Sequence, residues 1–300
     1  MTLHLRWKLV GVSCQALSAA LLLFGGCAAW GLAPADTACP PDSATARDTV
    51  VALGVPLPHT DGADLAPSRP APTAAERGQQ LRAAQHACEG PCVTPFGARL
   101  GVADGVEARS NCVSTCLHLE YSFVDRDSGQ LRVALQSPDP RRFEYAGVTY
   151  QCVEYARRWW IRNRGLTFGD VPTAADIFTL TQGQRLTGHE PVPLGRSLNG
   201  SAQRAPERGD LVVYAPDAAD PDWRFGHVAV VVAVDAERGW IALAEENYDN
   251  HPWRDPDNYA RRISLFTVDG RYTLMDVTPG TTRNPDGGRI LGWVYPMAAR

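Results

Sequence analysis

Three apolar runs in the second half of the chain are rich in β-branched residues and are separated by polar segments. They are GDLVVYAP at 209–216, GHVAVVVAV at 226–234 and WIALAEEN at 240–247. The segment DAERG at 235–239 has the length and composition of a turn. The pattern therefore predicts three strands, the last two joined as an antiparallel hairpin.

A second pattern, with the period of a helix, begins at Cys152. Val153, Ala156 and Trp160 recur at the i, i+3, i+7 spacing of one helix face. Gly165 suits the left-handed conformation that ends many helices. The sequence therefore predicts a helix over 152–165 with Cys152 in its first turn.

The N-terminal 35 residues have the pattern of a targeting segment. Arg6 and Lys8 precede an uncharged, largely apolar run over 9–33. A positive flank followed by an apolar centre indicates either a cleaved export signal or a membrane anchor. We expect residues 1–35 to be one of these two, which places the protein outside the cell, in the periplasm or on a membrane.

A segment rich in Pro and Ala follows the leader and precedes the folded part of the chain. Residues 36–90 show little aliphatic periodicity, so most of them cannot bury enough apolar surface to offset the entropy lost on ordering. We expect a stalk here, with one short helix at 76–87 leading into the folded part. Residues 91–298 are then a single domain.

Overall composition excludes one class of partner. The chain has 300 residues, is 44% hydrophobic and carries a net charge of −4. A nucleic-acid-binding protein concentrates Lys and Arg on one face, and no such excess exists here. We therefore expect no nucleic-acid partner, and a membrane contact only if the N-terminal segment is an anchor.

Four of the eight cysteines form two matched C-x-x-x-C units, CEGPC at 88–92 and CVSTC at 112–116. Such thiols hold structural zinc or close two disulfides. Export favours disulfides, because oxidising compartments preserve them. An antiparallel arrangement would join Cys88 to Cys116 and Cys92 to Cys112, which we state as a hypothesis. Cys152 would then remain a free thiol within the folded domain.

A free cysteine is either packed in the core or reactive, and its position decides between the two. In the first turn of a helix, with Thr149 as candidate N-cap, Cys152 faces unpaired backbone N–H groups and the positive end of the helix dipole. Both favour a thiolate, which is the nucleophilic form. A core cysteine suits the same position, so the helix alone leaves both interpretations open.

A cysteine nucleophile needs a general base, and the base needs a group that orients its ring. Among the seven histidines, His227 begins a predicted strand. Hairpin geometry places it opposite residues 245–247. Alternation puts Glu245 on the face with the larger apolar side chains and Glu246 on the other. We therefore choose Glu245 as the orienting acid, with Asn247 as the reserve.

Several of these motifs, in the same order, resemble one known family. YQCVEYARRWW at 150–160, RGDLVVY with FGHVAVV, ALAEEN, and RYTLMDVTP with RILGWVYP are similar to the CHAP amidase domain of the bifunctional glutathionylspermidine synthetases/amidases and of the trypanothione synthetases. The resemblance extends over about 95–297. It implies an α+β, papain-like fold, in which an N-terminal helix carrying the cysteine packs on an antiparallel sheet carrying the histidine and the glutamate.

The resemblance also implies roles for individual residues. Cys152 is the expected nucleophile, His227 the base and Glu245 the residue that orients it. Further groups are expected to line the site or its oxyanion hole: Gln151, Arg157 and Asn247. Arg158, in contrast, is expected on a solvated helix face. No metal and no organic cofactor is required.

The expected function is hydrolysis of an amide through a thioester at cysteine, as in glutathionylspermidine amidase, on a small peptide amide or a peptide–polyamine conjugate. One alternative is an exported peptidase or amidase of cell-wall peptides, since CHAP domains also cleave peptidoglycan cross-bridges. Another is an anchored CHAP module without catalysis. The bifunctional relatives continue into an ATP-dependent ligase domain, and a chain that ends at residue 300 is expected to lack that activity.

Overall fold

The computed structural model of the chain describes residues 74–218, 220–276 and 288–297. Its helical elements are α2 (Ala74–Ala87), α3 (Cys152–Arg164) and the 3-10 turns η1 (Ala174–Thr179) and η2 (Pro221–Trp223). Its strands are β1 (Arg99–Ala103), β2 (Val106–Arg109), β3 (Tyr121–Asp125), β4 (Leu131–Ala134), β5 (Phe143–Val148), β6 (Leu166–Thr167), β7 (Gln182–Arg185), β8 (Pro191–Leu198), β9 (Leu211–Tyr214), β10 (His227–Asp235), β11 (Trp240–Ala244), β12 (Arg261–Val268), β13 (Arg271–Met275) and β14 (Ile290–Pro296).

The expected leader, 1–35, and most of the expected stalk lie outside the described residues. The short helix expected at 76–87 is present as α2. Within the described ranges, no helix combines the length and the apolar character needed to cross a membrane.

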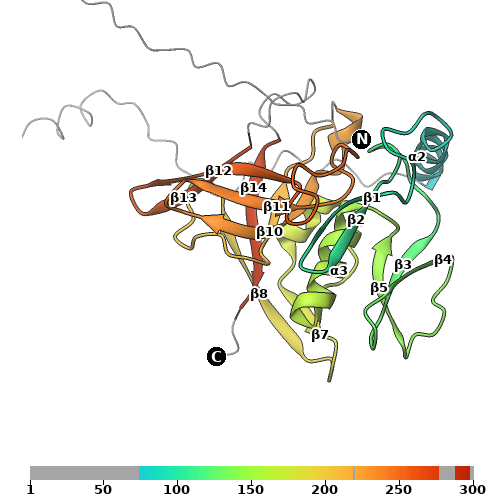
Figure 1. The fold of residues 1–300 in the computed structure, drawn as a ribbon, viewed down its shortest axis with the longest axis horizontal. Coiled ribbons are helices and arrows are strands. Elements are labelled where there is room, and N and C mark those ends of the chain that lie inside the picture. Colours follow the sequence, from blue (N-terminus) through green and yellow to red (C-terminus); the bar gives the residue numbers. More distant parts are fainter. Residues whose placement is uncertain (1–73, 219, 277–287, 298–300) are drawn as a thin grey trace, which may run out of the picture. The chain divides into compact units, whose positions relative to one another are not determined.

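The strands form one large antiparallel sheet and two small ones. The large sheet has the order β13-β12-β11-β10-β9-β14-β8-β7-β6, with β4-β3-β5 and the β1–β2 hairpin beside it (Figure 1). β14, the last described strand, pairs with both β8 and β9. With few helices and a mostly antiparallel sheet, the molecule has the α+β fold that the sequence predicted.

Helix α3 lies between the sheets, in contact with β10 of the large sheet and β5 of the small one (Figure 1). Its observed end matches the prediction, because Gly165 adopts a left-handed conformation with φ of 60°. Its start differs by two residues: the N-cap is Gln151 rather than Thr149, and it makes no side-chain capping bond. Cys152 is therefore the first helical residue.

The helix packs on one face of the large sheet. Ala242 and Ala244 of β11 belong to the same buried cluster as Tyr155, Trp159 and Trp160 of α3. That cluster also contains larger residues of β10: Val228, Val230 and Val232. The larger residues of β11 point to the other face and join a second cluster. On β11, therefore, the small side chains lie on the helix side.

The central hairpin has the register that the sequence predicted, apart from one irregularity. Val230 pairs with Ala244 and Val231 with Leu243, after which the register shifts by one residue before Ala233. A β-bulge of this kind adds one residue to one strand. β11 ends at Ala244, so Glu245 follows directly after the strand, at the end of the sheet where His227 begins β10.

Candidate active site

The structure places Cys152 at the N-terminus of α3, as a free and half-buried thiol. The first backbone N–H groups of a helix have no partner within the helix, and they carry partial positive charge. Glu154, in the same turn, is buried and turned to an arginine on the helix. The start of α3 therefore offers hydrogen-bond donors beside the sulfur.

His227, the first residue of β10, and Glu245, directly after β11, form a buried pair at one end of the large sheet. The His227 Nε2 atom lies 2.8 Å from Glu245 Oε2, and the residues are 4% and 3% exposed. Burial lowers the pKa of His227, but hydrogen bonds and charges from Cys152 and Glu245 outweigh it and raise that pKa to about 9. At neutral pH the ring is therefore an imidazolium. Because Nε2 is bonded to Glu245, Nδ1 is the nitrogen left for the Cys152 sulfur.

Glu245 stays ionised in this buried position. Burial raises its pKa, but the Arg261 guanidinium and His227 together lower it to about 2. The Arg261 Nε atom donates to Glu245 Oε1 at 2.6 Å. Arg261 is a site residue that the sequence analysis missed, although a charged residue within an apolar strand pattern was a usable signal.

Three aromatic rings enclose the imidazole of His227. Tyr214, Trp223 and Tyr248 have ring centroids 5.7, 6.0 and 5.5 Å from it. All three were missed by the sequence analysis. Edge and tilted contacts of this kind restrict rotation of the ring and exclude water from it.

Gln151 and Asn247 lie together, as the resemblance implied, and are clamped to the loop before the helix. Asn247 Nδ2 donates to Gln151 Oε1 at 2.8 Å, and Gln151 Nε2 donates to the carbonyl oxygen of Cys116 at 3.0 Å. An amide nitrogen has two hydrogens, so Gln151 retains one that can serve a second acceptor. Its carboxamide is fixed directly beside Cys152.

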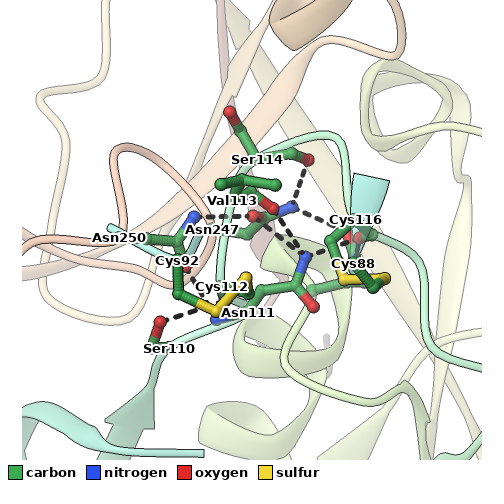
Figure 2. Close-up of a disulfide and its surroundings, with 11 residues drawn as sticks. Cys88, Cys92, Ser110, Asn111, Cys112, Val113, Ser114, Cys116, Asn247 and Asn250 are labelled. Atoms are coloured by element: carbon green, nitrogen blue, oxygen red, sulfur yellow. Dashed lines mark hydrogen bonds between the residues drawn. A yellow bond between two sulfur atoms is a disulfide. The ribbon is translucent and has the colours of Figure 1, made fainter. Parts of the chain in front are cut away.

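The same loop is closed by two disulfides, Cys88 to Cys116 and Cys92 to Cys112. This is the pairing stated as a hypothesis from the sequence, and these four sulfurs are bonded in pairs rather than available to zinc. Figure 2 shows Asn111 beside them, with its side-chain nitrogen donating to the Cys116 carbonyl at 2.6 Å. The segment 112–117, which we call the disulfide-braced loop, is thereby connected to the Gln151 side chain.

Two of the four arginines of α3, Arg157 and Arg158, are buried, and one expectation was wrong. Arg157 is 2% exposed and bonds the carbonyl oxygens of Phe168 and Ala146. Arg158 was expected on a solvated helix face but is 4% exposed. The β1–β2 hairpin covers that face, and Arg158 donates to the carbonyl oxygen of Glu107 at 2.6 Å.

Arg158 holds two carboxylates on the helix side of the sheet. It contacts Glu154 at 2.6 Å and Glu246 at 2.7 Å. Burial raises the pKa of Glu246 well above its usual range, and its proximity to Glu154 adds to this while Arg158 opposes it. Of the two neighbouring glutamates, only Glu245 bonds His227, whereas Glu246 bonds Arg158.

A cavity of about 560 Å³ opens onto Cys152 and His227. Gln151, Arg157 and Asn247 also line it. Its walls come from the disulfide-braced loop, from the segments 170–174 and 222–227, and from α2, with Ser114, Thr115, Cys116, Leu117, Ala83 and Ala87 among the lining residues. Five of the six residues expected at the site therefore line one cavity, which has the size of a small-molecule or peptide site, and the sixth, Glu245, lies behind His227.

Comparison with known proteins agrees with the resemblance stated from the sequence. Residues 143–247 match the family model of the CHAP domain. The bifunctional glutathionylspermidine synthetase/amidase of Escherichia coli (strain K12) is 32% identical over 201 residues, which cover 67% of this chain and 29% of that protein. The trypanothione synthetase of Crithidia fasciculata is 32% identical over 151 residues, 50% of this chain and 21% of that protein.

A glutathionylspermidine synthase of Crithidia fasciculata is 29% identical over 210 residues, 69% of this chain and 26% of that protein. The chain thus spans less than a third of the length of these relatives. The match over 143–247 begins at β5, contains both α3 and the central hairpin, and ends at Asn247.

Proposed function

We propose that this chain, with its CHAP-domain match over residues 143–247, is a cysteine-dependent amidase with a papain-like arrangement of its site. The single observation that carries the proposal is the buried His227–Glu245 pair, 2.8 Å apart, whose imidazole lines the same cavity as Cys152. Nucleophile, base and orienting acid then occupy one end of the sheet beside a cavity.

In the proposed reaction, the Cys152 sulfur attacks the carbonyl carbon of an amide held in the cavity. The charge that develops on the carbonyl oxygen is stabilised by the backbone N–H of Cys152 and by the second hydrogen of the Gln151 carboxamide. The His227 imidazolium gives its Nδ1 proton to the leaving amine, and a thioester forms. His227 then takes a proton from water as the water attacks the thioester, which releases the acid and leaves the Cys152 thiolate beside a protonated His227.

The relatives' names favour a glutathionylspermidine-like peptide–polyamine amide as substrate, or another small peptide amide. The two disulfides favour the alternative, an exported amidase or endopeptidase of cell-wall peptides, because disulfides persist in oxidising compartments. A membrane-anchored module without catalysis is the third candidate. Export and anchoring through 1–35 belong to the proposal as well.

The purified chain, incubated with glutathionylspermidine and with peptidoglycan cross-bridge peptides, distinguishes these functions. Cleavage of the first supports a small-molecule amidase, and cleavage of the second a cell-wall enzyme. The Cys152→Ala variant is the control, and we expect it to be folded and inactive on either substrate. Absence of cleavage of both by a folded wild-type chain favours the non-catalytic module.

A further inference from the structure

Arg261, which does not line the cavity, binds the carboxylate of Glu245. Arg261 of β12 donates from Nε to Glu245 Oε1 at 2.6 Å and from Nη2 to Glu245 Oε2 at 3.2 Å. Arg261 is 6% exposed and lies outside the segment that matches the CHAP domain. A guanidinium fork fixes both oxygens of a carboxylate, and hence the plane in which it accepts the His227 proton.

A second carboxylate lies on the far side of the same guanidinium. Asp276, which follows β13 and is 1% exposed, bonds Arg261 Nη1 through Oδ2. The hydroxyl of Tyr214 donates to that same oxygen at 2.8 Å and accepts from Arg261 Nη2 at 3.1 Å. The Tyr248 ring covers the guanidinium, 3.9 Å from its central carbon. Arg261, Asp276 and Tyr214 are all buried.

Charge explains why two carboxylates accompany one arginine. Glu245 and Arg261 alone would sum to zero, and a neutral pair would attract the imidazolium of His227 weakly. With Asp276 these three groups together carry one net negative charge, opposite in sign to the charge of His227. Because such charges are screened little when they are buried, this balance matters for the imidazole.

We propose that Arg261 and Asp276 are positioning residues for the reaction at Cys152. Arg261 orients the Glu245 carboxylate toward His227 Nε2, and Asp276 offsets the charge of Arg261 so that Glu245 remains an effective partner for the imidazolium. The inference rests on the proposed cysteine amidase function and extends it by two residues, neither of which lines the cavity.

The other groups that face His227 do not supply this balance. Cys152 reaches it from α3, and the Tyr214 and Tyr248 rings lie against it from β9 and from the loop after β11. Asp222 and Arg224 line the cavity with opposite charges, and Asp222 accepts a hydrogen bond from Ser114 at 2.9 Å. The second charged cluster, around Arg158, lies on the opposite face of the sheet.

The test is the titration of His227 in the full chain, followed by NMR of ¹⁵N-labelled histidine and assigned by the signal lost in His227→Gln. We expect Asp276→Asn to lower the His227 pKa by about one unit, because one buried negative charge is removed nearby. The alkaline limb of kcat/KM should move by the same amount on the substrate that the chain cleaves.

Tyr214→Phe is the matched control, since it removes two hydrogen bonds from the same network without changing any charge. Its His227 pKa should equal that of the wild type. The double variant Arg261→Gln with Asp276→Asn removes one positive and one negative charge, and the pKa should return toward the wild-type value. If Asp276→Asn does not fold, the double variant is the test. A His227 pKa in the double variant that is about one unit below the wild-type value contradicts the proposal.

An unchanged His227 pKa in folded Asp276→Asn overturns the inference, as does an equal shift in Tyr214→Phe, which would indicate a general structural effect. Neither result bears on whether the chain hydrolyses amides. Conversely, a wild-type chain that cleaves neither substrate type, while Asp276→Asn still shifts the His227 pKa, rejects the proposed function but retains the charge balance.

Discussion

Two adjacent glutamates show how strongly the local environment shifts the pKa of one residue type. Glu245 and Glu246 are both buried, 3% and 1% exposed, and lie on opposite sides of the backbone. Glu245 meets Arg261 and His227, so its pKa, raised by burial, is brought down to about 2. Glu246 shares one arginine with Glu154, and burial keeps its pKa well above the usual range. At two adjacent positions the pKa of the same residue type is thus shifted in opposite directions.

This difference predicts different effects of the same substitution. Glu245→Gln removes the charge that holds the imidazolium, so we expect kcat/KM to fall by about 100-fold or more. Glu246→Gln changes a side chain of the same shape that bonds Arg158 rather than His227, so the change in kcat/KM should be within about threefold. Steady-state kinetics on whichever amide the wild type cleaves measures both variants. Equal losses in the two variants would contradict the assignment.

For single residues, the sequence analysis named several that lie at one site, but it missed contacts with segments that are distant along the chain. Cys152, His227 and Glu245 follow from local periodicity and hairpin register. The burial of Arg158 depends on a hairpin about 50 residues earlier, and its helical position alone resembles a solvated one. Arg261 and Asp276 were missed because strand alternation does not reveal that two charges will face each other.

Glu245 does bond His227, but the reason used to choose it from the sequence does not hold. Larger side chains were taken to mark the more deeply packed face, but Ala242, Ala244, Ile241 and Leu243 are all fully buried. The small residues instead mark the face covered by α3. Glu245 is therefore on the face away from the helix body, where the base also lies.

Among the elements, the disulfide-braced loop has the most direct effect on the site. It lines the cavity from Ser114 to Leu117 and bonds Gln151 through the Cys116 carbonyl. Neither Cys92 nor Cys112 lines the cavity. The two disulfides should therefore differ in their effect on activity.

We expect the pair of substitutions Cys88→Ala and Cys116→Ala to lower kcat/KM about tenfold, since a carboxamide donor that loses its orientation costs roughly one hydrogen bond in the transition state. The matched pair Cys92→Ala and Cys112→Ala should lower kcat/KM less while reducing stability by a similar amount, about 3 kcal/mol for loops of this size. Kinetics and urea unfolding at one temperature separate the two effects. Equal kinetic losses would show that the loop acts only through stability.

Element boundaries were predictable wherever a local signal marks them. Gly165 marked the end of α3 correctly, whereas the N-cap lies two residues after the expected one, and the three apolar runs became β9, β10 and β11. The order of the large sheet was not predictable, because β14 inserts between β8 and β9 through backbone pairing that no local pattern encodes.

For the molecule as a whole, the buried imidazolium makes stability depend on pH. The pKa of His227 is raised in the folded state from 6.5 to about 9. A raised pKa contributes stability that is complete below pH 6.5 and is lost as pH rises through 9. The free energy of unfolding should therefore fall by about 3 kcal/mol between pH 6 and pH 9.5.

Urea unfolding at several pH values measures this dependence. The lowered pKa of Glu245 works in the opposite sense: its contribution is present above pH 4.5 and is lost as pH falls toward 2. The His227→Gln variant should lose the alkaline dependence and keep the acid one. A wild-type stability that is flat from pH 6 to 9.5 would contradict a buried imidazolium.

The most direct test of the account is to trap the acyl group on the enzyme. The wild-type chain is mixed with glutathionylspermidine or a cross-bridge peptide, quenched in acid within one turnover, and mapped by peptide mass spectrometry. The account predicts a hydroxylamine-labile acyl adduct on the peptide that contains Cys152, and neither adduct nor cleavage in Cys152→Ala. Cleavage of the amide by Cys152→Ala at the wild-type rate, or an adduct on a different residue, would contradict it.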